Sequence, residues 1–204
     1  MTVAKPEPVV CGIDPGLAKC GWCLLTGEKL AAAAVIRTKK ADGPEEARIH
    51  AITDALREII ATHPEEVTLL AVETQHAQGG DPATMRARAA ATNSVAAVRG
   101  AVVTVAHYLG IPVREVSPQE GKRALTGSGK ADKQAMVKFA RARFGEKLAT
   151  DAADACGIAL SALQVVAGRT PARKQAHQQK PREEAVSGWP AHVQDAIKRG
   201  RQLK

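Results

Sequence analysis

Four acidic residues in three separate segments stand at the end of an apolar run or at the start of a helical one. Asp14 lies in Gly-Ile-Asp-Pro-Gly, Glu73 follows Leu-Leu-Ala-Val, and Asp151 and Asp154 lie in Thr-Asp-Ala-Ala-Asp-Ala. Carboxylates in such surroundings are costly unless a cation lies between them. Mg²⁺ prefers hard oxygen ligands, and two such ions about 3.5–4 Å apart assist in-line displacement at a phosphodiester. The pattern therefore predicts two divalent metal ions per active site and a nuclease.

Each acid alone also has an ordinary structural explanation. Asp14 before Pro-Gly suits a turn, and Asp151 beside Thr150 suits helix capping. Glu73 is harder to explain in this way, because it ends an apolar run. The order and spacing of all four acids together favour the metal site, in which water is the nucleophile and no Ser, Cys or His nucleophile is required.

Apolar periodicity and turn residues predict an α/β fold, with a mixed sheet and helices packed on it. The strands are expected at residues 8–14, 21–26, 30–36, 67–73 and 113–116. The helices are expected from Pro44, from Pro82 with Asp81 as the N-cap to about Leu109, from about Asp132 to Arg143, and from a capping Thr150 to about Val166.

These elements bring the acids together. Asp14 and Glu73 end two strands, so their carboxylates can converge above one edge of the sheet. Asp151 and Asp154 are three positions apart at the start of a helix, so both lie on one face of it.

The formal charge of +8 is spread unevenly along the chain. Residues 168–204 carry nine Lys or Arg against three Asp or Glu, which predicts a flexible basic tail after a nuclease domain at residues 1–167. The chain has no apolar stretch long enough for a membrane span and no signal-peptide pattern at its N-terminus. Cys20 and Cys23 are not expected to bind zinc, because positions three apart in a strand face opposite sides.

The motifs at residues 12–16 (Gly-Ile-Asp-Pro-Gly), 21–22 (Gly-Trp), 71–73 (Ala-Val-Glu) and 151–155 (Asp-Ala-Ala-Asp-Ala) resemble those of the RuvC-type Holliday-junction resolvases. The likeness covers residues 8–167 in the right order and spacing. It implies an RNase H-like fold with a mixed five-stranded sheet flanked by helices. It also implies a crossover junction endodeoxyribonuclease that nicks two opposed strands of a four-way DNA junction and leaves 5′-phosphates.

The resemblance carries further expectations about the site and its partners. Asp14, Glu73, Asp151 and Asp154 are the matching catalytic acids and metal ligands, and two Mg²⁺ ions, or Mn²⁺ in their place, are the matching cofactors. The protein is expected to be a homodimer, with the long helix in its interface. A branch-migration motor is a candidate partner, and the cytoplasm of a bacterium or of a phage-infected cell is the expected location.

Five residues are candidates for DNA contact. By the resemblance, Lys122 and Lys133 match two basic residues of the family. Arg123 and Lys130 belong to the same basic stretch, around a loop Gly-Ser-Gly that is expected to be flexible and to let the backbone approach phosphates. His76 stands where bacterial members commonly have an aromatic residue, and histidine also stacks on bases.

Two other functions compete with junction resolution. A binding module could keep the fold without cleaving, although retention of four anions in a cleft argues against it. An RNA-processing nuclease of the same superfold would use the same acids. Nicking assays on junction DNA, RNA and RNA–DNA hybrids separate the three.

Overall fold

The computed structural model describes residues 7–63, 66–74 and 82–168, with the backbone alone for residues 82–91. Five strands form one sheet in the order β3-β2-β1-β4-β5. They are β1 (Val9–Asp14), β2 (Lys19–Thr26), β3 (Lys29–Arg37), β4 (Leu69–Glu73) and β5 (Val113–Val116). The first three strands form an antiparallel meander, whereas β4 runs parallel to both β1 and β5. The predicted mixed five-stranded sheet is confirmed.

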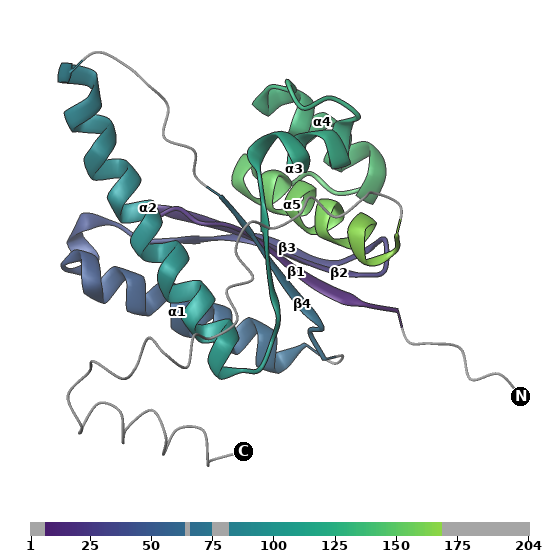
Figure 1. Ribbon diagram of the computed structural model, residues 1–204, viewed down its shortest axis with the longest axis horizontal. Coiled ribbons are helices and arrows are strands. Elements are labelled where there is room, and N and C mark those ends of the chain that lie inside the picture. The colour runs from purple at the N-terminus through teal and green to yellow at the C-terminus, as the bar shows by residue number, and fades with distance from the viewer. Residues whose placement is uncertain (1–6, 64–65, 75–81, 169–204) are drawn as a thin grey trace, which may run out of the picture. The chain divides into compact units, whose positions relative to one another are not determined.

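Helices cover both faces of this sheet (Figure 1). They are α1 (Glu45–Thr62), α2 (Pro82–Tyr108), α3 (Pro118–Thr126), α4 (Lys133–Phe144) and α5 (Thr150–Val166), with a short 3₁₀ turn at Lys40–Asp42. One core lies between the sheet and α5, with α3 and α4 packed outside α5. The other core lies between the sheet and the pair α1 and α2.

Helix α3 was not predicted, because its sequence is short and polar. Its start nevertheless carries a recognisable signal in Ser117-Pro118-Gln119-Glu120. The Ser117 hydroxyl accepts a hydrogen bond from the Glu120 amide (3.3 Å), and the Glu120 carboxylate accepts one from the Ser117 amide (2.8 Å). This reciprocal capping, with proline at the first helical position, fixes where the helix begins.

The predicted cap of α5 was wrong. The helix begins at Thr150 itself, and the N-cap position is Ala149, whose side chain makes no capping hydrogen bond. The start of α5 is held instead by its packing on the sheet, because almost every residue from Ala152 to Leu163 is buried. The predicted N-cap of α2, Asp81, lies outside the described residues.

The four cysteines are buried free thiols. Cys20 packs in the core beside α1, and Cys23 packs in the core beside α5, which confirms that the two face opposite sides of β2. None of the helices in the described part of the chain is long and apolar enough to span a membrane. All of the predicted tail except Gly168 lies outside the described residues, so the boundary after residue 167 stays a prediction.

Candidate active site

Two of the four acids meet at one edge of the sheet. Asp14 is the last residue of β1 and Glu73 is the last residue of β4. The two strands are parallel neighbours, and Ile13 is paired with Val72. Asp14 and Glu73 are the next residue on each strand, so their carboxylates lie at the same end of the two strands. Both residues follow strand residues that are fully buried, and this holds their backbone in place.

Helix α5 brings the other two acids to the same edge, and two glycines allow it to come close. A Cβ at Gly12 of β1 would lie 2.8 Å from the Cβ of Ala159, and one at Gly21 of β2 would lie 2.5 Å from the carbonyl carbon of Asp151. Both separations are well inside van der Waals contact. Glycine at these two positions therefore lets the first turns of α5 rest directly on β1 and β2.

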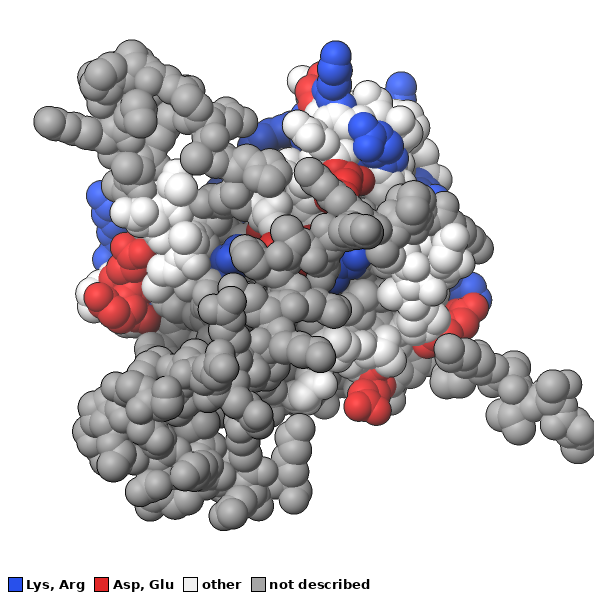
Figure 2. All heavy atoms as spheres, viewed as in Figure 1, with Lys and Arg blue, Asp and Glu red and all other residues white. Residues whose placement is uncertain are grey.

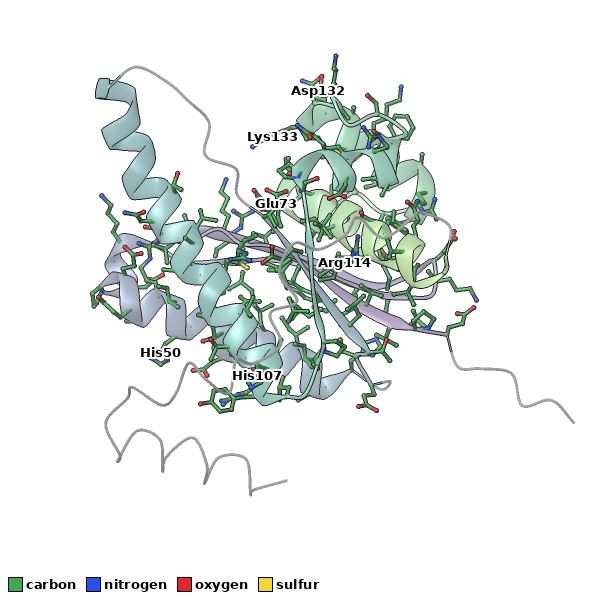
Figure 3. The ribbon with its side chains drawn as sticks, viewed as in Figure 1. His50, Glu73, His107, Arg114, Asp132 and Lys133 are labelled. Atoms are coloured by element: carbon green, nitrogen blue, oxygen red, sulfur yellow. The ribbon has the colours of Figure 1, made fainter. Side chains whose placement is uncertain are left out.

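All four acids line one cleft of about 280 Å³. Lys122 from α3 and Lys133 from the start of α4 complete its polar lining. Figure 3 shows Glu73 at the end of β4 and Lys133 at the start of α4, on the same side of the sheet edge. The structure thus brings together all four predicted acids and the two lysines that the family motif singled out.

Three of the cleft carboxylates, those of Asp14, Glu73 and Asp154, have raised pKa values. Burial, as the largest cause, and the neighbouring charges of Glu73, Asp154 and Asp151 together raise the pKa of Asp14 to about 8, although Lys133 lowers it. Burial and the Asp154 charge raise the pKa of Glu73 to about 7, against the lowering effect of Lys122. Burial also raises the pKa of Asp154, although both lysines lower it. Four acids that repel one another are thus only partly compensated by two lysines.

This donor set fits divalent cations. Oxygen ligands suit Mg²⁺, and a cation between the acids would offset both the burial and the mutual repulsion that raise the pKa values of Asp14, Glu73 and Asp154. Within the described residues, no three Asp, Glu, His or Cys side chains are arranged as a ready-made metal site. The two observations are compatible, because Mg²⁺ keeps several waters and is usually bound through only one or two carboxylates.

A family model described as crossover junction endodeoxyribonuclease RuvC matches residues 10–162. The chain belongs to the RuvC family. The RuvC of Methylococcus capsulatus is 37% identical over 161 residues, which cover 76% of this chain and 89% of that protein. The RuvC of Methylorubrum populi is 34% identical over 159 residues, which cover 74% of this chain and 78% of that protein.

A solved structure supports the same assignment. The structure titled "T. thermophilus RuvC in complex with Holliday junction substrate" superimposes with a TM-score of 0.64 at 26% identity, covering 80% of this chain and 98% of that one. The RNase H-like fold class expected from the sequence is therefore confirmed. The match of the family model spans the segments that carry all four acids of this RuvC-family chain.

Two of the other predicted DNA contacts, Arg123 and Lys130, do not line the cleft. Arg123 is exposed on α3, and Lys130 is exposed in the connection between α3 and α4. That connection, expected to be flexible, contains hydrogen bonds from the Ser128 amide to the Thr126 hydroxyl (3.1 Å) and from the Lys130 amide to the Ser128 hydroxyl (3.3 Å). His76 lies outside the described residues.

Sequence reasoning missed the apolar wall of this RuvC-family cleft. Pro118 and Gly121 of α3, Met136 of α4 and Ile158 of α5 line it beside the charged groups. Recognising the capping box at Ser117 would have placed Pro118 and Gly121 on a helix, with Lys122 on the next position. Met136 and Ile158 give no such signal, because any apolar helical residue has the same pattern.

Proposed function

We propose that this chain is a metal-dependent endonuclease that resolves four-way DNA junctions by paired nicks in two opposed strands. The observation that carries the proposal is the cleft in which Asp14, Glu73, Asp151 and Asp154 face two lysines, in a member of the RuvC family. A relative of the same fold was solved, by its title, in complex with a Holliday junction substrate.

The four acids would hold two Mg²⁺ ions, or Mn²⁺ in their place. Bound there, the cations would supply Lewis-acid stabilisation of the attacking and the leaving oxygen of an in-line displacement. The acids would have to lose their protons to act as ligands, which the raised pKa values of Asp14 and Glu73 make dependent on pH.

The lysines would act on the substrate from the opposite wall of the cleft. Lys122 and Lys133 extend from α3 and α4, whereas the acids come from the sheet edge and α5. Cationic side chains bind DNA phosphates without regard to base sequence. A strand between the two walls would therefore be held with a phosphate toward the lysines and its scissile bond toward the acids.

A homodimer would place two such clefts on one junction. The two-fold symmetry of a dimer matches that of a four-way junction, in which two opposed strands are equivalent. Two large apolar side chains at the end of the long helix support an interface, because Tyr108 is 84% exposed and Leu109 is 43% exposed. The same proposal includes a branch-migration motor as a partner of this protein and the cytoplasm as its location.

A nicking assay on a labelled four-way junction tests the function. With Mg²⁺, the wild type should cut two opposed strands and leave ends that a ligase reseals. Asp14→Asn, Glu73→Gln and Asp154→Asn should each abolish nicking while keeping junction affinity within a few-fold of the wild type. A variant that still nicks would remove its residue from the proposed metal site.

Parallel substrates distinguish the two competing functions. A wild type that binds junctions but never nicks them with Mg²⁺ or Mn²⁺ would be a binding module. Faster cleavage of RNA or of an RNA–DNA hybrid than of junction DNA would indicate an RNA-processing enzyme. Linear duplex DNA is the matched control, because a structure-selective enzyme should leave it intact.

A further inference from the structure

A second groove opens beside the acidic cleft. It has a volume of about 430 Å³ and is lined by Lys133, Gln134, Val137, Lys138, Arg141, Lys147 and Thr150. We call this hollow, defined by these lining residues, the α4 groove. It shares Lys133 with the cleft, and Thr150 immediately precedes the cleft residue Asp151. The α4 groove therefore adjoins the cleft at the start of α4.

The sequence builds this groove from one helix face and one returning segment. Positions 134, 137, 138 and 141 recur at helical spacing, so their side chains share one face of α4. The helix ends at Phe144, and the following Gly145 has a φ of 76°, the left-handed conformation that glycine adopts at low cost. The chain then turns back, and Lys147 and Thr150 complete the opposite side.

Positive charge dominates the α4 groove. Four of its lining residues are Lys or Arg and none is acidic. Figure 2 shows Lys and Arg side chains gathered over the region of α3 and α4. Among the described residues, Lys138, Arg141 and Lys147 form no salt bridge. Each cation is therefore available to an external anion.

Neighbouring charges on and beside α4 are either paired or absent from the groove lining. Arg143, also on α4, is already paired with Glu28 at 2.6 Å and does not line the groove. The carboxylate of Asp132 caps α4 by accepting a hydrogen bond from the Ala135 amide at 2.8 Å. Glu146 is exposed beside Lys147 but is not among the lining residues.

We propose that the α4 groove binds the phosphate backbone of a junction arm where the DNA continues out of the acidic cleft. This inference rests on the proposed junction-resolving function and extends it to residues outside the catalytic site. Lys138, Arg141 and Lys147 each contact a phosphate, and the Thr150 hydroxyl and the Gln134 amide are neutral donors beside them. Val137 forms an apolar floor, and because no aromatic side chain lines the groove, binding there is independent of base sequence.

The test compares two triple variants that remove the same charge. Lys138→Ala/Arg141→Ala/Lys147→Ala removes the proposed contacts. Lys29→Ala/Lys40→Ala/Arg37→Ala removes three exposed cations that form no salt bridge within the described residues and line neither the cleft nor the α4 groove. Junction affinity is measured at several salt concentrations with Ca²⁺ in place of Mg²⁺. A charge-conserving variant, Lys138→Arg/Arg141→Lys/Lys147→Arg, shows whether charge alone is required.

Three lost phosphate contacts should make the slope of log K against log[salt] shallower by about 2.7. If these contacts contribute little at about 1 M salt, their loss should weaken binding about 500-fold at about 0.1 M salt. The loss should be equal on junctions of different sequence, and the charge-conserving variant should recover most of it. Equal affinity and slope in the two alanine triples would overturn the inference. Thermal melting of each variant excludes a folding defect, which is not expected because all three side chains are exposed.

The outcome can be separated from that of the proposed function. A wild type that binds junctions without nicking would contradict cleavage, and the salt slopes would still decide the α4 groove. A wild type that nicks normally, with an alanine triple identical to its control, would contradict the groove alone. A wild type that binds no junction would overturn both.

Discussion

Replacing Gly21 by alanine should damage catalysis through a backbone contact, although residue 21 is not one of the four acids. The added Cβ would lie 2.5 Å from the carbonyl carbon of Asp151, and the carbonyl oxygen would be closer still. Ordinary van der Waals contact begins near 3.4 Å. The atoms involved are backbone and cannot rotate away, so β2 and the start of α5 must separate by about 0.9 Å or more.

That separation sets the expected magnitudes. Insertion of a methyl group into a packed site costs about 1–3 kcal/mol, and the lower chain entropy of alanine returns about 0.5–1 kcal/mol. The free energy of unfolding should therefore fall by no more than about 2.5 kcal/mol, less than the roughly 5–15 kcal/mol stability typical of a folded domain. Asp151 and Asp154 move with α5, and a misplacement of about 1 Å at a catalytic site costs about 100-fold in rate.

The assay is single-turnover nicking of a four-way junction at saturating protein, with Mg²⁺ titrated. Gly21→Ala should nick about 100-fold more slowly and require more Mg²⁺, with junction affinity nearly unchanged because Lys122 and Lys133 remain. Gly100→Ala is the control, because no heavy atom lies within 4 Å of a Cβ at that exposed helix position. Sedimentation of both variants verifies an unchanged assembly state. Wild-type nicking by Gly21→Ala would refute the argument that this glycine positions α5.

Three further outcomes follow from the electrostatics of the cleft. Because the pKa of Asp14 is raised from 3.8 to about 8, its ionisation destabilises the metal-free fold as the pH rises through that range. Melts in chelator should show Asp14→Asn more stable than the wild type by up to about 6 kcal/mol at pH 9 and similar to it at pH 4. Equal stability at both pH values would contradict the shift. The Mg²⁺ affinity measured by calorimetry should rise between pH 6 and pH 9, and binding should release protons, because Asp14 and Glu73 must deprotonate to bind the metal. A pH-independent affinity would exclude these two residues as ligands. Lys122→Ala should weaken junction binding and reduce its salt slope by about 1, and an unchanged slope would exclude a phosphate contact.

Most of the sheet and the position of the acids could be predicted from local patterns. The apolar runs ending in Asp14 and Glu73 predicted two strands, and their parallel pairing explains why the acids meet. Asp151 and Asp154 share a helix face by spacing alone. These features depend on the spacing of apolar and polar residues along short segments, and this spacing can be read directly from one sequence.

The remaining features depend on contacts between distant residues. Helix α3 was missed because Pro118–Thr126 is short and polar, and its burial depends on α5. The close approach of Gly21 to Asp151 joins positions that no local pattern links. Lys147 could not be assigned to the α4 groove for the same reason, since its position there depends on how the chain turns after Gly145.

The packing of helix α5 offsets the repulsion among the four carboxylates of the cleft. Four carboxylates repel one another and are partly desolvated, so without cations they oppose the packing that brings them together. Helix α5 offsets that cost, because it buries an almost continuous run of apolar residues from Ala152 to Leu163 against the sheet and α3. A close contact with α3 adds to this, since a Cβ at Gly157 would lie 2.6 Å from the Gly121 carbonyl oxygen. The element that carries Asp151 and Asp154 thus also fixes the helix that carries Lys122, so acids and cation keep their spacing as one packed unit.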